Sequence, residues 1–197
     1  KARPLMGPDD DSYVLVRFVS WSASHDYGLK GFSPEQKRSL IAGLSRCALV
    51  YISSEQELPP DLAAYLFPLP PADLPHAIAF AALVIGEGAT VAAEAAVLGT
   101  PAIYINPQSL GYLEEMERFG LVRNHGAYSD GILAEAGMMV ADRARRQEVR
   151  ERRQRMLADK IDVTAFLAWF IEKYPESLRT MRENPEYHLR FKAPDRR

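Results

Sequence analysis

Short apolar runs alternate with amphipathic or charged stretches along this chain. β-Branched and aromatic residues dominate Tyr13–Ser20, and near-continuous apolar runs fill Ala82–Ile85 and Ala102–Asn106. Runs of this kind predict buried strands. Ser33 and Pro34 show the N-cap and first-turn pattern of a helix. Because strands that alternate with helices are joined by right-handed crossovers, we expect an α/β fold with a parallel sheet and helices on both of its faces.

The chain is expected to divide into three parts. Residues 1–12 form a polar linker, residues 13–160 hold the α/β domain, and residues 161–197 hold a final helix and a tail. Two further strands are expected, at Ala48–Ser53 and, more briefly, at Leu121–Val122. The expected helices cover residues 34–47, 59–65, 74–81, 90–98, 110–119, 142–160 and 162–173, another begins within 128–136, and a polar tail follows Pro175.

A glycine turn joins the strand at Ala82–Ile85 to a short alanine-rich helix. The turn is Gly86-Glu-Gly-Ala-Thr90. A turn at a helix N-terminus presents backbone N–H groups, and the helix dipole favours negative charge there. Glu94 lies four residues beyond Thr90 on the same helix face, where a carboxylate suits a ribose diol. The turn is therefore either a phosphate cradle or an ordinary tight turn. Thr90 is expected to cap the helix or to donate its hydroxyl to a phosphate, and the two roles are compatible.

Other polar residues follow the predicted strands, where ligand sites form in parallel sheets. Ser24 and His25 come after the first strand. His25 titrates near neutral pH and is a candidate general acid or base, with an ordinary surface turn as the alternative. Glu87 would repel a phosphate, so we expect it to point away or to hold a sugar hydroxyl or a catalytic water. Arg17 lies within an apolar strand and needs a partner such as a carboxylate.

The composition is that of an ordinary globular protein. Of the 197 residues, 47% are hydrophobic and 25% charged, and the net charge of −2 argues against a dedicated nucleic-acid binder. The single cysteine cannot form a disulfide within the chain, no apolar run approaches the ~20 residues of a membrane span, and no signal peptide is visible. We therefore expect a cytoplasmic protein. The four histidines are scattered, so neither a metal nor a cofactor is expected.

Two segments near the C-terminus carry unusual side chains. Arginines crowd residues 143–155, but Glu148 and Glu151 interleave with them, which favours a solvated helix face over an RNA-binding surface. The last helix, Val163–Ile171, is apolar almost all round, so it is buried on more than one side or meets a partner. Binding through this helix predicts an exposed apolar patch around Phe166, Trp169 and Phe170.

Three stretches of the sequence resemble a prokaryotic family of unknown function that is related to GT-B glycosyltransferases and UDP-N-acetylglucosamine 2-epimerases. They are Tyr13-Val-Leu-Val-Arg-Phe-Val-Ser-Trp-Ser-Ala-Ser-His-Asp26, Ile52-Ser-Ser-Glu55 and Gly86-Glu-Gly-Ala-Thr-Val-Ala-Ala-Glu-Ala-Ala-Val-Leu-Gly-Thr-Pro101. In the GT-B fold two Rossmann-like domains face each other across a cleft, and the C-terminal one holds the nucleotide-sugar. The resemblance implies that this chain is such a Rossmann-like C-terminal half, a fragment whose partner is an N-terminal domain or a second copy.

The resemblance also implies roles for individual residues. Gly88, Ala89 and Thr90 would offer N–H groups to the diphosphate, and Glu94 would accept hydrogen bonds from the ribose. The proline turn at Leu69 and Pro70 would lie by the base, while Ser24 and His25 would reach the phosphates or the sugar. The chain departs from the epimerase pattern, because Gly86-Glu-Gly-Ala89 stands where the epimerases have Asp-Ser-Gly-Gly.

Two functions follow as expectations. The first is a nucleotide-sugar-binding domain, with UDP-sugars as the expected class, from a glycosyltransferase or a sugar epimerase. The chain alone would be inactive, because the resemblance implies that part of the catalytic acids come from the other domain. The alternative is a non-catalytic Rossmann-like module that binds a partner protein through its C-terminal helices.

Overall fold

The computed structural model describes residues 13–21 and 29–192 and contains one parallel sheet. Its five strands lie in the order β2-β1-β3-β4-β5. The predicted α/β, Rossmann-like fold is confirmed. The strands are β1 (Tyr13–Phe18), β2 (Leu49–Ser54), β3 (Leu83–Gly86), β4 (Ala102–Ile105) and β5 (Val122–His125). The direction of winding reverses between β1 and β3, which is where sheets of this kind bind ligands.

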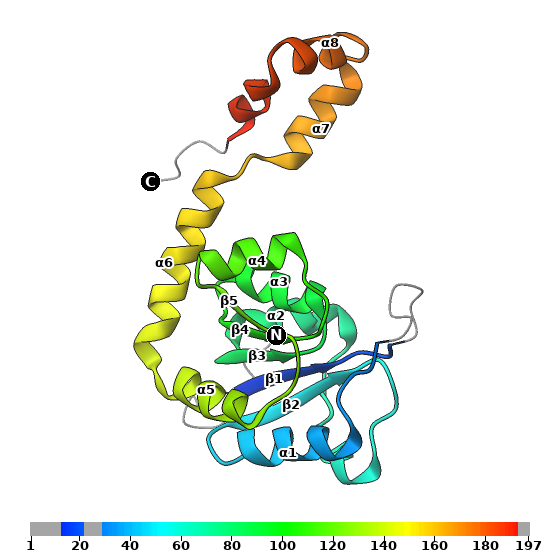
Figure 1. The fold of residues 1–197 in the computed structure, drawn as a ribbon, viewed down its shortest axis with the longest axis vertical. Coiled ribbons are helices and arrows are strands. Elements are labelled where there is room, and N and C mark those ends of the chain that lie inside the picture. The colour runs from blue at the N-terminus through cyan, green and yellow to red at the C-terminus, as the bar shows by residue number, and fades with distance from the viewer. Residues whose placement is uncertain (1–12, 22–28, 193–197) are drawn as a thin grey trace. The chain divides into compact units, whose positions relative to one another are not determined.

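Helices cover both faces of the sheet (Figure 1). Helices α1 (Pro34–Leu44) and α5 (Asp130–Ala141) pack against each other on one face. The other face carries α2 (Leu74–Phe80), α3 (Ala89–Leu98) and α4 (Gly111–Arg118), in which α3 contacts both neighbours. Short 3-10 helices, η3 (Pro60–Tyr65) and η4 (Pro71–Asp73), connect β2 to α2. Because both faces are covered, the strand side chains form the core, and Val14, Val16, Leu83 and Ile85 are fully buried.

Local sequence signals set several element ends. The Ser33 hydroxyl accepts a hydrogen bond from the Gln36 N–H, and the Gln36 side chain accepts one from the Ser33 N–H, so α1 begins with the predicted cap. Helix α3 ends at Gly99, whose φ of 84° is left-handed. Asp73 precedes α2 as expected, but its side chain makes no capping hydrogen bond.

The chain divides into two compact units, residues 1–153 and 154–197. The division falls within α6 (Arg143–Asp159), whereas the expected boundary lay after residue 160; that boundary remains a prediction. The second unit also contains α7 (Val163–Glu172), α8 (Glu176–Glu183) and the 3-10 helix η5 (Pro185–Phe191). Among the described residues, no helix combines the length and the apolar character that crossing a membrane requires.

Two expectations about the C-terminal segment are wrong. The segment after Pro175, expected as a polar tail without a helix of its own, forms α8 and η5, because Tyr187 and Phe191 supply aromatic rings that pack on α7. For the same reason Phe166, Trp169 and Phe170 do not form an exposed patch, and each is half-buried. The exposed apolar residues of this helix and its end are instead Val163, Leu167, Ile171 and Tyr174.

Gly86 ends β3 at the point where this strand passes closest to β1. A Cβ atom at this position would lie 2.1 Å from the Arg17 carbonyl oxygen. The approach lets the Glu87 N–H donate a hydrogen bond to that carbonyl, at 3.1 Å. Gly86 therefore allows the chain to turn out of the sheet into α3 while β1 and β3 stay paired.

We expect Gly86→Ala to lower the free energy of unfolding by about 3 kcal/mol, because the methyl group meets backbone that cannot move aside. The control is Gly137→Ala in α5, where a Cβ has nothing within 4 Å. It should raise stability by about 0.5–1 kcal/mol, since Ala favours a helix interior. Urea denaturation of both variants checks the prediction, and equal effects would contradict it.

Candidate functional site

A pocket of about 500 Å³ lies at the carboxyl ends of β1, β3 and β4. Its walls come from the end of β1, the turn after β3, the first turn of α3 and the segment that follows β4. The pocket thus occupies the position where the winding of the sheet reverses. Its size lies within the range of pockets that bind small molecules, about 300–1,000 Å³.

The first turn of α3 opens on this pocket. Gly88 is the N-cap residue, and no side chain caps the helix. The Ala92 N–H donates to the Gly88 carbonyl, at 3.0 Å, so the N–H groups of residues 89–91 precede the first intrahelical bond and have no acceptor within the helix. Thr90 lies one position inside the helix and does not cap it, contrary to one expectation. The turn therefore has the donors that an anion requires.

Glu87 is buried, with 2% of its surface exposed, and its carboxylate accepts hydrogen bonds from separate segments. Oε1 accepts from the Phe32 N–H at 2.6 Å and from the Trp21 indole at 3.1 Å. Oε2 accepts from the Val19 N–H at 3.3 Å. The carboxylate thus points away from the α3 turn and holds the chain after β1 against the chain before α1.

Burial raises the pKa of Glu87 above its ordinary value, although the hydrogen bonds from Phe32, Trp21 and Val19 and the charge of Lys37 act in the opposite direction. Trp21 is held here with a left-handed φ of 54°, which a large side chain rarely adopts. Its strained backbone is the conformation in which its indole reaches Glu87. The buried carboxylate of Glu87 and the strained backbone of Trp21 therefore both lie next to the pocket.

Arg17 is paired with a carboxylate, as its place in an apolar strand required. Its Nη2 donates to Glu55 Oε1 at 2.5 Å, and its Nη1 donates to the Ser53 hydroxyl at 2.8 Å. Glu55 Oε2 also accepts from the Ser20 N–H, at 2.9 Å. Burial alone would raise the pKa of Glu55, but the bond from Ser20 and the charge of Arg17 outweigh it and the pKa is lowered.

The structure brings together some of the sequence-predicted residues and leaves others apart. Glu87, Gly88, Ala89 and Thr90 line the pocket. Glu94 is half-buried on α3, one turn beyond Thr90, and is not part of the pocket wall as described. Leu69 and Pro70 lie between η3 and η4, also outside that wall. Ser24 and His25 lie outside the described residues.

Sequence reasoning missed the contribution of the segment after β4. Asn106 Nδ2 donates to the Glu87 carbonyl at 3.2 Å, and its Oδ1 accepts from the Gln108 N–H at 2.9 Å. Asn106, Gln108 and Tyr112 all line the pocket. Their position just after a buried strand was the available signal, because the carboxyl ends of parallel strands share one edge of the sheet.

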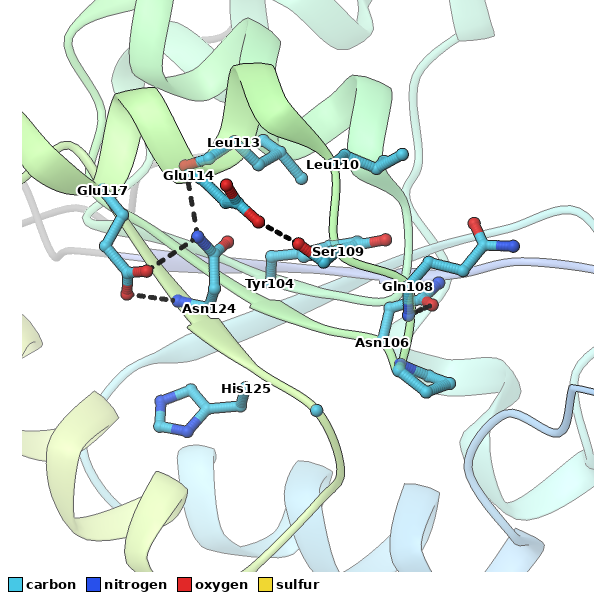
Figure 2. A pocket seen from close by; sticks show the side chains of 12 residues that line it. Tyr104, Asn106, Gln108, Ser109, Leu110, Leu113, Glu114, Glu117, Asn124 and His125 are labelled. Atoms are coloured by element: carbon cyan, nitrogen blue, oxygen red, sulfur yellow. Dashed lines mark hydrogen bonds between the residues drawn. The ribbon is translucent and has the colours of Figure 1, made fainter.

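A second pocket, of about 230 Å³, lies beside the first at the ends of β4 and β5 (Figure 2). The two share part of their wall, including Asn106. Asn124 donates to Glu117 from its backbone N–H at 2.9 Å and from Nδ2 at 3.0 Å, and Nδ2 also donates to the Leu113 carbonyl at 3.1 Å. Its Oδ1 is buried and has no hydrogen-bond partner among the described residues. Together with Glu114, this pocket is rich in acceptors and suits groups that donate hydrogen bonds, such as hydroxyls.

Within the described part of the chain, no group of three or more His, Cys, Asp or Glu side chains is placed to hold a metal ion. The larger pocket is lined by N–H donors, by Arg17 and by carboxylate and hydroxyl side chains, and the second pocket adds further carboxylates and the imidazole of His125.

No protein-family model matches this chain, and no curated protein sequence does. Solved structures do. The glycotransferase of kitacinnamycin superposes with a TM-score of 0.51 at 14% identity, over 75% of this chain and 40% of that one. A protein from Listeria monocytogenes assigned as a UDP-N-acetylglucosamine 2-epimerase superposes with a TM-score of 0.51 at 14% identity, over 80% of this chain and 46% of that one. The chain spans less than half the length of either protein and has the fold of one half of the GT-B architecture.

The raised pKa of Glu87 predicts a definite pH dependence of stability. Because the native state binds the Glu87 proton more tightly than the unfolded chain does, this protonation favours folding below pH 4.5. Its contribution to stability is lost as the pH rises through the raised pKa. We therefore expect the free energy of unfolding of the wild type to fall, relative to Glu87→Gln, as the pH rises from 4.5. Urea denaturation at a series of pH values measures it.

The control for this prediction is Glu55→Gln, because the pKa of Glu55 is shifted in the opposite direction. A lowered pKa stabilises the native state above the ordinary value and loses that contribution as the pH falls. The wild type should therefore gain stability relative to Glu55→Gln as the pH rises toward 4.5. If the free energies of unfolding of wild type and Glu87→Gln differed by the same amount at every pH, burial would not raise the pKa of Glu87.

Proposed function

We propose that this chain binds a nucleotide-sugar, with UDP-sugars as the expected class, and that it is the C-terminal half of a GT-B-type glycosyltransferase or sugar epimerase. The observation that carries the proposal is the uncapped N-terminus of α3, which opens on a pocket of about 500 Å³ where the winding of the sheet reverses. There Gly88, Ala89 and Thr90 would donate to the diphosphate.

The surroundings of the turn support a diphosphate at this position. Arg17 lies against the turn, since a Cβ on Gly88 would be 3.1 Å from Arg17 Cγ, and it lines the same pocket. Arginine is the residue best suited to phosphate oxygens. The neighbouring acceptor-rich pocket around Asn124 suits the hydroxyl groups of a sugar.

The remaining roles are extensions of this proposal. Glu94, one helical turn from Thr90, would accept hydrogen bonds from the ribose, and the turn at Leu69 and Pro70 would lie by the base. His25 is proposed as an acid or base. Glu87, whose carboxylate is occupied by N–H donors, is proposed to position the site rather than to react. Turnover would need the other half of the protein, so the chain alone should bind without catalysing.

We expect UDP to bind the chain, and Thr90→Ala and Glu94→Ala each to weaken it about ten- to hundredfold. A hydrogen bond to a charged group contributes about 1.5–3 kcal/mol, which corresponds to that range. Calorimetric titration with UDP and UDP-sugars measures the affinities.

Matched controls are available on α7. Thr164→Ala removes a threonine from the second position of a helix, as Thr90→Ala does, and Glu172→Ala removes an exposed helical carboxylate. Neither should change the affinity. Absence of UDP binding at millimolar concentration, or equal affinities in all four variants, would count decisively against the proposal.

A second candidate function is supported by α7. Val163, Leu167 and Ile171 recur every four residues and are 58%, 49% and 71% exposed, and Tyr174 extends the stripe with 63% exposed. Apolar residues in such a row are typical of a surface that binds another protein. We propose the missing half of the protein, or a second copy of this chain, as the partner.

We expect the purified chain to self-associate, and the double variant Leu167→Ser, Ile171→Ser to be more monomeric. Because the double variant removes two large apolar side chains from the interface, association should weaken at least about tenfold. Sedimentation over a range of concentrations measures this. Met138→Ser, at a 65% exposed position of α5 in the first unit, is the control and should leave association unchanged. A wild type that stays monomeric at every concentration would exclude the second copy as the partner.

A further inference from the structure

The larger pocket already contains an anion of its own, the carboxylate of Glu55. It binds Arg17 Nη2 at 2.5 Å through one oxygen and the Ser20 N–H at 2.9 Å through the other. Arg17, Ser20 and Glu55 all line the pocket that the N-terminus of α3 opens on. A phosphate placed at α3 would therefore meet an arginine whose charge is neutralised and a carboxylate that repels it.

The two partners of this ion pair differ in how firmly they are held. Arg17 has a second hydrogen bond, from Nη1 to the Ser53 hydroxyl at 2.8 Å, its stem lies against Gly88, and its side chain is only 18% exposed. The Glu55 side chain is 41% exposed, although its backbone N–H is anchored to the Phe18 carbonyl at 3.3 Å. Exposed ion pairs contribute little to stability, so the carboxylate can rotate into solvent at small cost.

Glu87 behaves differently, although it lies in the same wall. The residue is 2% exposed, and its carboxylate has backbone or indole donors on both oxygens. Releasing it would leave buried donors without acceptors, which costs about 1–3 kcal/mol for each. Of the two carboxylates, only Glu55 is placed to leave when a ligand arrives.

We propose that Glu55 is an internal counter-ion, which occupies Arg17 and the Ser20 N–H until an anionic ligand displaces it and takes both donors. Arg17 is thereby a ligand-binding residue, and Glu55 sets a threshold that selects for ligands with enough negative charge, such as a diphosphate, over weaker anions. This inference rests on the proposed binding of a diphosphate in the same pocket.

The test measures binding of inorganic pyrophosphate and of UDP by calorimetry in low salt. Glu55→Gln should bind pyrophosphate about three- to tenfold more tightly than the wild type, because the repulsion and the competition are both removed. Arg17→Met should bind it more weakly, and adding Glu55→Gln to Arg17→Met should restore little, since the residue for which Glu55 competes is gone. The advantage of Glu55→Gln should shrink in 1 M salt, which screens charges beyond about 3 Å.

Asp61→Asn is the matched control. Asp61 forms an equally short-range ion pair with Arg38, at 2.6 Å, and neither residue lines the larger pocket as described. The substitution removes the same charge from the protein, so it should leave the pyrophosphate affinity unchanged. If Asp61→Asn gains as much as Glu55→Gln, net charge explains the effect and the counter-ion role is refuted.

A measurement on the wild type covers the case in which Glu55→Gln folds poorly. Carbon-13 resonances of the Glu55 carboxyl and the amide resonance of Ser20 should shift together during a pyrophosphate titration, with one midpoint. Resonances that stay in place while pyrophosphate binds would overturn the inference, as would equal affinity of wild type and Glu55→Gln or no pyrophosphate binding by either.

The same titrations separate the two proposals. UDP that binds the wild type and Glu55→Gln equally well would overturn the counter-ion role and leave nucleotide-sugar binding intact. UDP that binds no more tightly than pyrophosphate in every variant would contradict nucleotide recognition, while a gain in pyrophosphate affinity for Glu55→Gln would still support the counter-ion.

Discussion

One buried carboxylate joins the segments that surround the larger pocket. The side chain of Glu87 accepts hydrogen bonds from Val19, Trp21 and Phe32, and its backbone is bonded to Arg17 and Asn106. Glu87 thus makes hydrogen bonds to the ends of β1 and β4 and to the start of α1. Because that residue immediately precedes the N-cap of α3, the same contacts also determine where the helix N-terminus points.

Some of the N–H donors around the pocket bind carboxylates of the protein itself, and others have no acceptor within their helix. Consecutive N–H groups after β1, those of Val19 and Ser20, are taken by the carboxylates of Glu87 and Glu55. The first N–H groups of α3 have no acceptor within the helix. Because these carboxylates do not accept hydrogen bonds from the first N–H groups of α3, the N-terminus of α3 is the stronger place for a bound anion. The two carboxylates also differ in burial: Glu87 is structural, and Glu55 can move.

The fold explains why a site exists at this edge without saying what reacts there. This chain superposes on less than half of each of the two solved structures, and at 14% identity it shares the fold with them alone. What distinguishes this chain is the chemistry at the rim: an arginine neutralised by Glu55, a buried Glu87 and an acceptor-rich neighbouring pocket around Asn124.

Local sequence patterns predicted the strands, most of the helices and the cap at Ser33, because burial on both faces of a sheet and capping chemistry leave such patterns. They also located the α3 turn. Three contacts are visible only in the tertiary structure. Arg17 pairs with Glu55, 38 residues away, and the Glu87 carboxylate points away from the α3 turn and accepts from Phe32. Tyr187 and Phe191 pack the C-terminal segment against α7. Each of these contacts joins residues far apart along the chain or orients a side chain among several donors, and a local pattern contains no information about which distant partner the fold will bring within reach.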